Sequence, residues 1–228
     1  MFDNIRHPAG MKKIYERGRE NREMNIVMFE NGPFMVNTYL VINEKTNESF
    51  ILDPGSELEP LINRIKKEKL DISAIVCTHA HIDHVAGAKL VQDRFSAPLY
   101  LNEQEKEWVK ALPAQARMFC VPDPGVPTID RNLPESGTVE IAGITFTLLH
   151  TPGHSPGSIS LYDGNTVFCG DALFNMSIGR TDLPGGDYQT LIRSIEEKLL
   201  TLPGNTRVLC GHGPETTIDF EKRMNPFF

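Results

Sequence analysis

Three of the seven histidines in the chain lie in one motif, HxHxDH, at residues 79–84. The motif follows the apolar run 73–77, which has the length and composition of a short buried strand. If the chain leaves this strand in an extended conformation, His79, His81 and Asp83 project to one side, because strand side chains alternate with a period of two. His84 then points elsewhere and can serve a second centre. Because imidazole nitrogens and carboxylate oxygens bind Zn²⁺ and non-haem iron, the motif predicts a metal centre.

Three more potential ligands occupy the same kind of position, on a loop after a predicted strand. They are His154, Asp171 and His212. Loops at strand ends present site residues on a rigid scaffold. Gly170 and Gly211, each next to one of these residues, let the backbone pass close to a metal. Together the four strand ends provide seven nitrogen or oxygen ligands, which is enough for two metal ions rather than one.

The rest of the chain alternates short apolar runs with a few amphipathic stretches, which is typical of sheets with helices packed outside them. Strands are predicted at residues 26–29, 34–42, 49–52, 73–77, 98–101, 138–141, 144–149, 158–162, 166–169 and 207–210. Helices are predicted around 58–65, over 188–199 with Asp187 as N-cap, and after Asn102 in the segment that carries Trp108. Five prolines between residues 112 and 137 indicate a long connection between two halves.

The length and charge of the chain limit its organisation and its partners. With 228 residues, we expect one catalytic domain over 24–228, preceded by an extension, 1–23, of different charge. The net charge of −7 argues against nucleic-acid binding, and no apolar run is long enough to span a membrane.

The four cysteines show no CxxC spacing and no secretory signal precedes them, so we expect unpaired buried thiols and a cytoplasmic protein. The oligomeric state is left open.

A second motif suggests a different chemistry. Residues 153–157 fit GxSxG, the nucleophile elbow of serine hydrolases. That elbow uses the backbone N–H of the residue after the serine in its oxyanion hole, and Pro156 has no N–H. The elbow must also open a helix, whereas the residues after Gly157 have the pattern of a strand. Ser155 is therefore not expected to act as a nucleophile.

Five motifs together resemble those of the metallo-β-lactamase superfamily, and within it those of the short bacterial glyoxalase II-like hydrolases. The resemblance extends from about Met24 to the C-terminus. It includes ILDPG at 51–55, HxHxDH at 79–84, TPGH at 151–154, GDALF at 170–174 and GHGPET at 211–216. The implied fold is of the α/β class, an αββα sandwich of two mixed sheets with helices outside and the metals at one edge.

The resemblance also implies how the ligands divide between two metals. The expected ligands are His79, His81 and His154 for the first metal, Asp83, His84 and His212 for the second, and Asp171 as a bridge between both. The expected cofactors are two divalent ions, zinc with iron or manganese as alternatives, because these ligand types suit all three.

The chemistry implied by this site is hydrolysis of an ester-like carbonyl. Two metals acidify a shared water, and Asp83 is expected to be catalytic by orienting this nucleophile and passing its proton to the leaving group. An aspartate at position 171, where two-zinc β-lactamases tend to carry cysteine, and the retention of His84 favour glyoxalase II-like over antibiotic hydrolysis. Residues 179–182 have the sequence GRTD. Arg180 in this loop is expected either to bind a substrate carboxylate or to form a structural ion pair. We expect a small-molecule thioester substrate such as S-D-lactoylglutathione.

Two alternative activities stay open within the same superfamily. Persulfide dioxygenases share the HxHxDH and GRTD features but use one iron, held by two histidines and one aspartate. A lactonase would open lactone rings instead. Longer glyoxalase II enzymes append a C-terminal helical domain that supplies much of the glutathione site, and this sequence ends shortly after His212. We therefore expect that domain to be absent, which leaves the thiol of the substrate open.

Overall fold

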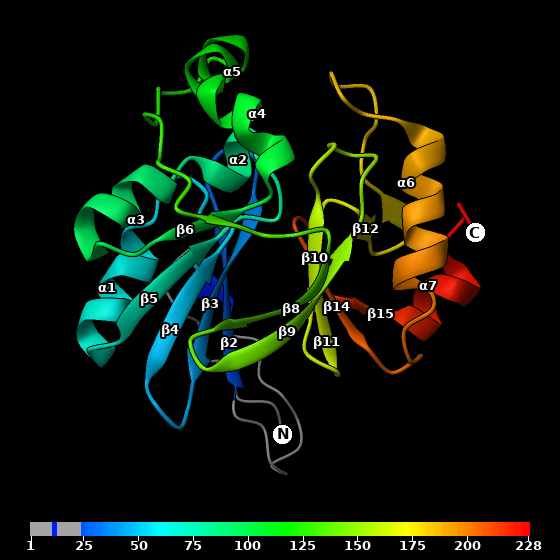
Figure 1. Ribbon diagram of the computed structural model, residues 1–228, viewed down its shortest axis with the longest axis horizontal. Helices are drawn as coiled ribbons and strands as arrows, with labels where there is room; N and C mark the ends of the chain where they lie inside the picture. Colours follow the sequence, from blue (N-terminus) through cyan, green and yellow to red (C-terminus); the bar gives the residue numbers. More distant parts are fainter. Residues whose placement is uncertain (1–10, 13–23) are drawn as a thin grey trace.

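Two β-sheets pack face to face, with helices on the outer face of each (Figure 1). The computed structural model describes residues 11–12 and 24–228. Within them, the expected α/β class and the αββα arrangement of two mixed sheets are confirmed. Of the expected extension 1–23, only Met11–Lys12, strand β1, lies inside the described residues. No helix in this described part is long and apolar enough to cross a membrane.

The first sheet contains seven strands that follow one another in chain order. They are β1 (Met11–Lys12), β2 (Met24–Asn31), β3 (Val36–Asn43), β4 (Glu48–Leu52), β5 (Asp71–Val76), β6 (Leu99–Leu101) and β7 (Arg131–Asn132). Pairs from β1 to β4 are antiparallel and pairs from β4 to β7 are parallel. Parallel neighbours need crossover connections, and these contain α1 (Glu59–Glu68), α2 (Ile82–Val85) and α3 (Ala88–Phe95).

The second sheet contains six strands in the order β15-β14-β11-β10-β9-β8. They are β8 (Ser136–Ile141), β9 (Ile144–His150), β10 (Ile159–Tyr162), β11 (Thr166–Gly170), β14 (Arg207–Cys210) and β15 (Thr216–Thr217). Only the β11–β14 pair is parallel. The connection between these two strands contains the hairpin β12 (Leu173–Phe174) and β13 (Ser177–Ile178), then α6 (Tyr188–Ser194) with a π-helical turn at Ile195–Leu199. Helix α7 (Ile218–Met224) follows β15.

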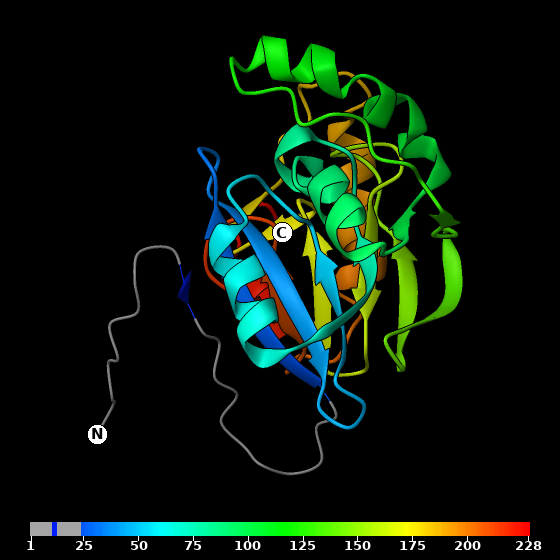
Figure 2. The same ribbon diagram turned by 90° about the vertical axis from the view of Figure 1, so that its left-hand side faces the viewer.

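The alternation of side chains along the strands builds three separate cores. In β2, Val27 and Phe29 pack with helices α1 and α3, which cover the outer face of the first sheet (Figure 2). The intervening Ile26 and Met28 pack between the two sheets, as a period of two requires. The third core lies under α6 and α7 on the outer face of the second sheet. Because this sheet is covered on both faces, the central strand β3 is buried at every position.

The predicted elements agree closely with those in the structure. Each of the ten predicted strands has an observed counterpart. Asp187 caps α6 by accepting from the backbone N–H of Thr190 at 2.7 Å. Asn102 accepts from the N–H of Gln104 at 2.9 Å and starts the 3₁₀ turn η1 (Glu103–Glu105). This turn leads into α4 (Lys106–Lys110), the helix that carries Trp108.

Three expectations are wrong in part. The stretch 112–137 is not only a connection, because α5 (Leu112–Met118) occupies its start and places Pro113 in the first turn, where its missing N–H costs no helical hydrogen bond. The exit from β5 is extended only as far as His81, since α2 begins at Ile82. All four cysteines are unpaired as expected, but Cys120 is exposed, while the others are buried.

Candidate metal centre

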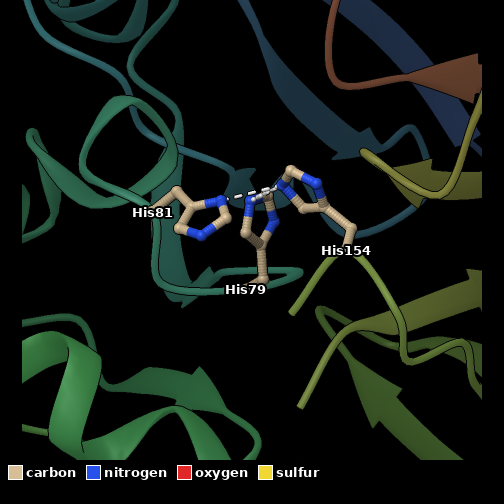
Figure 3. Close-up of side chains that lie close together, drawn as sticks. All are labelled: His79, His81 and His154. Atoms are coloured by element: carbon tan, nitrogen blue, oxygen red, sulfur yellow. Dashed lines mark hydrogen bonds between the residues drawn. The ribbon is translucent and has the colours of Figure 1, made fainter. Parts of the chain in front are cut away.

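Three histidines from two separate loops meet at the edge of the sandwich. His79 and His81 lie on the loop after β5, and His154 lies on the loop between β9 and β10 (Figure 3). Nδ1 of His81 is 2.8 Å from Nε2 of His154, and that same Nε2 is 3.2 Å from Nε2 of His79. All three side chains are buried. This is the set that the resemblance implies for a first metal.

The hydrogen bonds on the far side of these rings decide which nitrogens carry protons. Nδ1 of His154 is 2.7 Å from the carbonyl oxygen of Arg180 and must donate to it. The Thr78 hydroxyl donates to Asp53 at 2.8 Å, so it accepts from Nδ1 of His79 at 3.1 Å. In the neutral rings, Nε2 of both histidines then carries a lone pair. Two lone pairs that face each other at 3.2 Å repel, so the arrangement fits a cation between them.

The pKa shifts of His79 and His81 favour the neutral, metal-binding form of these two rings. Burial, followed by the neighbouring His84 and His81, lowers the pKa of His79 well below its usual value. Burial and His154 lower the pKa of His81 to about 3. Both rings are therefore neutral at pH 7, the form in which imidazole binds a metal without first losing a proton.

A second group adjoins the first and contains the other expected ligands. Oδ2 of Asp83 lies 3.1 Å from Nε2 of His212 and 3.7 Å from Nε2 of His84. Asp83 does not reach this place by strand alternation, because it lies in the first turn of α2. Each of these three residues offers one ligand atom within 4.8 Å of the others. This is the set that the resemblance implies for a second metal.

Asp171, at the end of β11, faces both groups. Its Oδ1 lies 3.2 Å from Nε2 of His84, and its Oδ2 lies 3.5 Å from Nε2 of His154 and 3.6 Å from Nε2 of His212. A glycine is required beside it, since a Cβ on Gly211 would lie 2.1 Å from Oδ1 of Asp171. The expected bridging residue is thus placed between the two groups, although the binding of a metal by these residues stays a prediction.

Unsatisfied polar atoms show that the second group also fits a cation. Nε2 of His84 and Oδ1 of Asp171 are buried and have no hydrogen-bond partner in the described part of the chain. Burial would lower the pKa of His84, but Asp171, Asp83 and Asp53 outweigh it and raise that pKa well above its usual value. The surrounding carboxylates therefore favour a positive charge here, which a divalent ion would supply.

Two buried carboxylates support the ligands, and neither is among the site residues predicted from the sequence. Asp53, directly after β4, accepts from Nδ1 of His84 at 3.0 Å and from the N–H of Thr78 at 2.7 Å. Glu105 accepts from the N–H of Ala80 at 2.9 Å and from the Ser155 hydroxyl at 2.7 Å. Asp53 follows an apolar strand as the ligands do, and this placement could have identified it.

Other residues considered from the sequence lie outside the two groups. His150 hydrogen-bonds through Nε2 to the carbonyl oxygen of Pro156 at 2.8 Å. Ser155 is buried and its hydroxyl donates to Glu105, and no helix follows it, so the structure gives it none of the features of a nucleophile elbow. Arg180 forms a bidentate ion pair with Asp182, in which Nε lies 2.7 Å from Oδ1 and Nη2 lies 2.7 Å from Oδ2. The hydrogen bonds from Arg180 lower the pKa of Asp182 to about 2.

A cavity of about 410 Å³, here called the ligand cavity, gives access to both groups. Among its lining residues are His81, Asp83, His154, Asp171 and His212. The aromatic side chains of Phe34, Phe119 and Phe174 form part of its wall. A substrate in this cavity would contact the candidate ligands on one side and an apolar wall on the other.

The sandwich and its histidine–aspartate cluster define a protein of the metallo-hydrolase class. The family model described as the Metallo-beta-lactamase superfamily matches residues 31–212. The chain belongs to the metallo-β-lactamase superfamily. It is 40% identical over 213 residues to the hydroxyacylglutathione hydrolase GloC of Haemophilus influenzae, which covers 90% of this chain and 98% of the relative. It is 41% identical over 200 residues to the probable metallo-hydrolase YqgX of Bacillus subtilis, covering 86% and 93%.

Solved structures show the same fold. The BLEG-1 B3 metallo-β-lactamase has a TM-score of 0.83 at 43% identity, covering 89% of this chain and 98% of that one. TTHA1623 in a di-iron-bound form has a TM-score of 0.81 at 39% identity, covering 88% and 99%. ETHE1 from Myxococcus xanthus has a TM-score of 0.75 at 27% identity, covering 88% and 83%. TTHA1623 shows that a closely similar fold holds two irons.

Proposed function

We propose that this protein is a thioester hydrolase with two divalent metals, acting on a substrate of the S-D-lactoylglutathione type. The observation that carries the proposal is the pair of adjoining ligand groups joined by Asp171, in which lone pairs and carboxylates face one another. The 40% identity to a hydroxyacylglutathione hydrolase supports the substrate class. When bound, two divalent ions would supply Lewis acidity and acidify a water.

Asp83 is the residue that we assign to proton transfer. It lines the ligand cavity, and its side chain is 18% exposed while that of His84 beside it is fully buried. Burial would raise the pKa of Asp83, but His84 and the hydrogen bond from His212 outweigh it and lower that pKa. The carboxylate is therefore ionised at neutral pH and able to orient a water and accept its proton. A thiolate leaving group needs little help from an acid.

Arg180 is the residue that we assign to a substrate carboxylate. Its guanidinium pairs with Asp182, but the two side chains are 55% and 69% exposed. Exposed ion pairs contribute only about 0–1 kcal/mol, so a substrate carboxylate can displace Asp182. Arg180→Ala should then raise KM for a glutathione thioester and leave kcat nearly unchanged, because the lost contact is the same in ground and transition states.

A single-iron oxidation is the second candidate, because the HxHxDH and GRTD features resemble those of persulfide dioxygenases. A one-metal mechanism would leave Asp83, His84 and His212 without a metal, although they form a group of their own. β-Lactam hydrolysis is a further candidate, since BLEG-1 is called a B3 metallo-β-lactamase.

The test combines elemental analysis with assays before and after chelation. We expect two metals per chain, turnover of S-D-lactoylglutathione that chelator abolishes and added metal restores, and little turnover of a β-lactam or a lactone. One iron per chain with oxygen uptake on glutathione persulfide would overturn the hydrolase assignment. Cleavage of other esters but not of lactoylglutathione would overturn the substrate class alone.

A further inference from the structure

A second cavity, here called the side cavity, opens next to the ligand cavity and has a volume of about 420 Å³. Phe34, Ile82 and Asp83 line both cavities, so the two meet at the first turn of α2. The side cavity extends from there toward the start of α1, the start of α3 and the loop at 121–124. A substrate placed at the metal-ligand groups would therefore have room for a long substituent in this direction.

The lining of the side cavity favours an apolar, uncharged substituent. Its wall includes Leu58, Ala86, Leu90 and Val121, together with three prolines. Among the described residues its lining contains no lysine or arginine, whereas it contains the acidic residues Glu57, Glu59, Asp83 and Asp123. A carboxylate would be repelled from such a place, so the side cavity is a poor site for the two carboxylates of a glutathione moiety.

The ligand cavity differs from the side cavity because its lining includes a positively charged residue. Arg180 lines the ligand cavity but not the side cavity. Charge therefore orients a substrate that fills both cavities. The carboxylates of its thiol moiety lie toward Arg180, and its apolar acyl group lies toward Leu58 and Leu90.

We propose that the side cavity binds the acyl chain of the substrate and that the preferred acyl group is a straight, apolar chain longer than lactoyl. This inference rests on the proposed thioester hydrolysis in the ligand cavity. It predicts that binding strengthens with each methylene until the side cavity is filled.

A series of thioesters with one constant thiol tests the preference. The metal-loaded protein is assayed with acetyl, butyryl, hexanoyl and octanoyl thioesters of N-acetylcysteamine, together with S-D-lactoylglutathione. We expect kcat/KM to rise about threefold to fourfold for each methylene, as the burial of one methylene group predicts. A flat or falling series would overturn the proposal.

The variant Leu90→Glu tests whether the acyl chain binds in the side cavity. Leu90 lies on α3 and is 43% exposed, so a glutamate there can be solvated while its charge faces the side cavity. We expect kcat/KM for the octanoyl thioester to fall at least tenfold and that for the acetyl thioester to change less than twofold. The matched control is Met224→Glu on α7, which is 53% exposed and lines neither cavity. An equal loss in both variants, or for both chain lengths, would contradict the assignment of the side cavity.

A binding measurement separates this inference from the proposed function. The S-octyl and S-ethyl thioethers of N-acetylcysteamine cannot be hydrolysed, and their affinities are measured by calorimetry on the metal-loaded protein. We expect the octyl compound to bind at least tenfold more tightly than the ethyl compound, and Leu90→Glu to remove the difference. If this holds but no thioester is cleaved, the proposed function fails and the side cavity still binds an acyl chain. Equal affinities would overturn the inference whatever the catalytic result.

Discussion

Oδ2 of Asp53 lies 3.0 Å from Nδ1 of His84, and both side chains are fully buried. The two residues come from different strand ends, since Asp53 follows β4 and His84 lies in α2 beyond β5. The carboxylate accepts the Nδ1 proton, so in the neutral, metal-binding form of the ring Nε2 of His84 carries a lone pair, 3.2 Å from Oδ1 of Asp171. Partners of this kind fix the tautomer of a metal-binding histidine and raise its basicity.

Asp53→Asn should weaken metal binding by the group that contains His84. The amide keeps the shape of the carboxylate but cannot accept from all three donors, the Thr78 N–H, the Thr78 hydroxyl and His84. We expect the affinity for the second metal to fall about 10–100-fold, measured by competition with a chromogenic chelator. Asp163→Asn is the control, because Asp163 is also a hydrogen-bond acceptor, here for two backbone N–H groups, but lies at a hairpin turn. Unchanged affinity in Asp53→Asn would show that the His84 contact is structural only.

Substitution of a single ligand residue should remove the metal that is held by the group to which the residue belongs. His81→Ala removes a member of the first group and His212→Ala a member of the second, so each should leave about one metal per chain. Asp171→Ala should affect both groups and lower the metal content further, because its two oxygens face both. Elemental analysis after dialysis gives the counts. His150→Ala should retain the wild-type content, since the His150 side chain contacts the Pro156 carbonyl and Glu135 and belongs to neither ligand group. Full metal content in His212→Ala would contradict the second group.

Glu105→Gln should destabilise the protein through the loops that carry the ligands. The fully buried carboxylate accepts from Ala80 on the HxHxDH loop and from Ser155 and Gly157 on the loop of His154. A glutamine keeps one acceptor oxygen and turns an NH₂ group toward the remaining donors, which should cost about 2–4 kcal/mol. Denaturant unfolding of the metal-free protein measures this free energy. Glu107→Gln, where the side chain is 78% exposed and pairs with Lys110 on the surface, should change it by less than about 0.5 kcal/mol. Similar losses in the two variants would contradict the role given to Glu105.

The strands and the ligand residues could be predicted because their evidence is local. An apolar run such as 166–169 is bounded by turn residues on both sides, and its position as a strand follows from those few residues alone. The HxHxDH motif likewise places three histidines within one short segment. The short helices α2, α3, α5 and α7 have few apolar positions at helical spacing, so tertiary packing decides them.

The contacts of the supporting residues could not be predicted because their partners are distant in the sequence. Glu105 and Gly157 are separated by 52 positions, and Asp53 and His84 by 31. Asp53 lies in the ILDPG motif directly after an apolar strand, but nothing local identifies His84 as its partner, and Glu105 has no such placement. Glu105 contacts both ligand-bearing loops only because the fold brings these loops together.

Gly153→Ala should displace His154 and destabilise the fold beyond the cost of backbone strain. Gly153 has φ +125°, and a Cβ there would lie 2.2 Å from the backbone nitrogen of Leu191 in α6, an atom that cannot move alone. Gly137→Ala isolates the strain, because Gly137 has φ +103° and no atom within 4 Å of its Cβ position. We expect about 1 kcal/mol of destabilisation at Gly137 and roughly 3 kcal/mol or more at Gly153, where overpacking adds to the strain. Denaturant unfolding gives both free energies, and elemental analysis should show metal loss only in Gly153→Ala, since His154 is the next residue. Equal destabilisation and equal metal content in the two variants would mean that α6 does not hold the His154 loop in place.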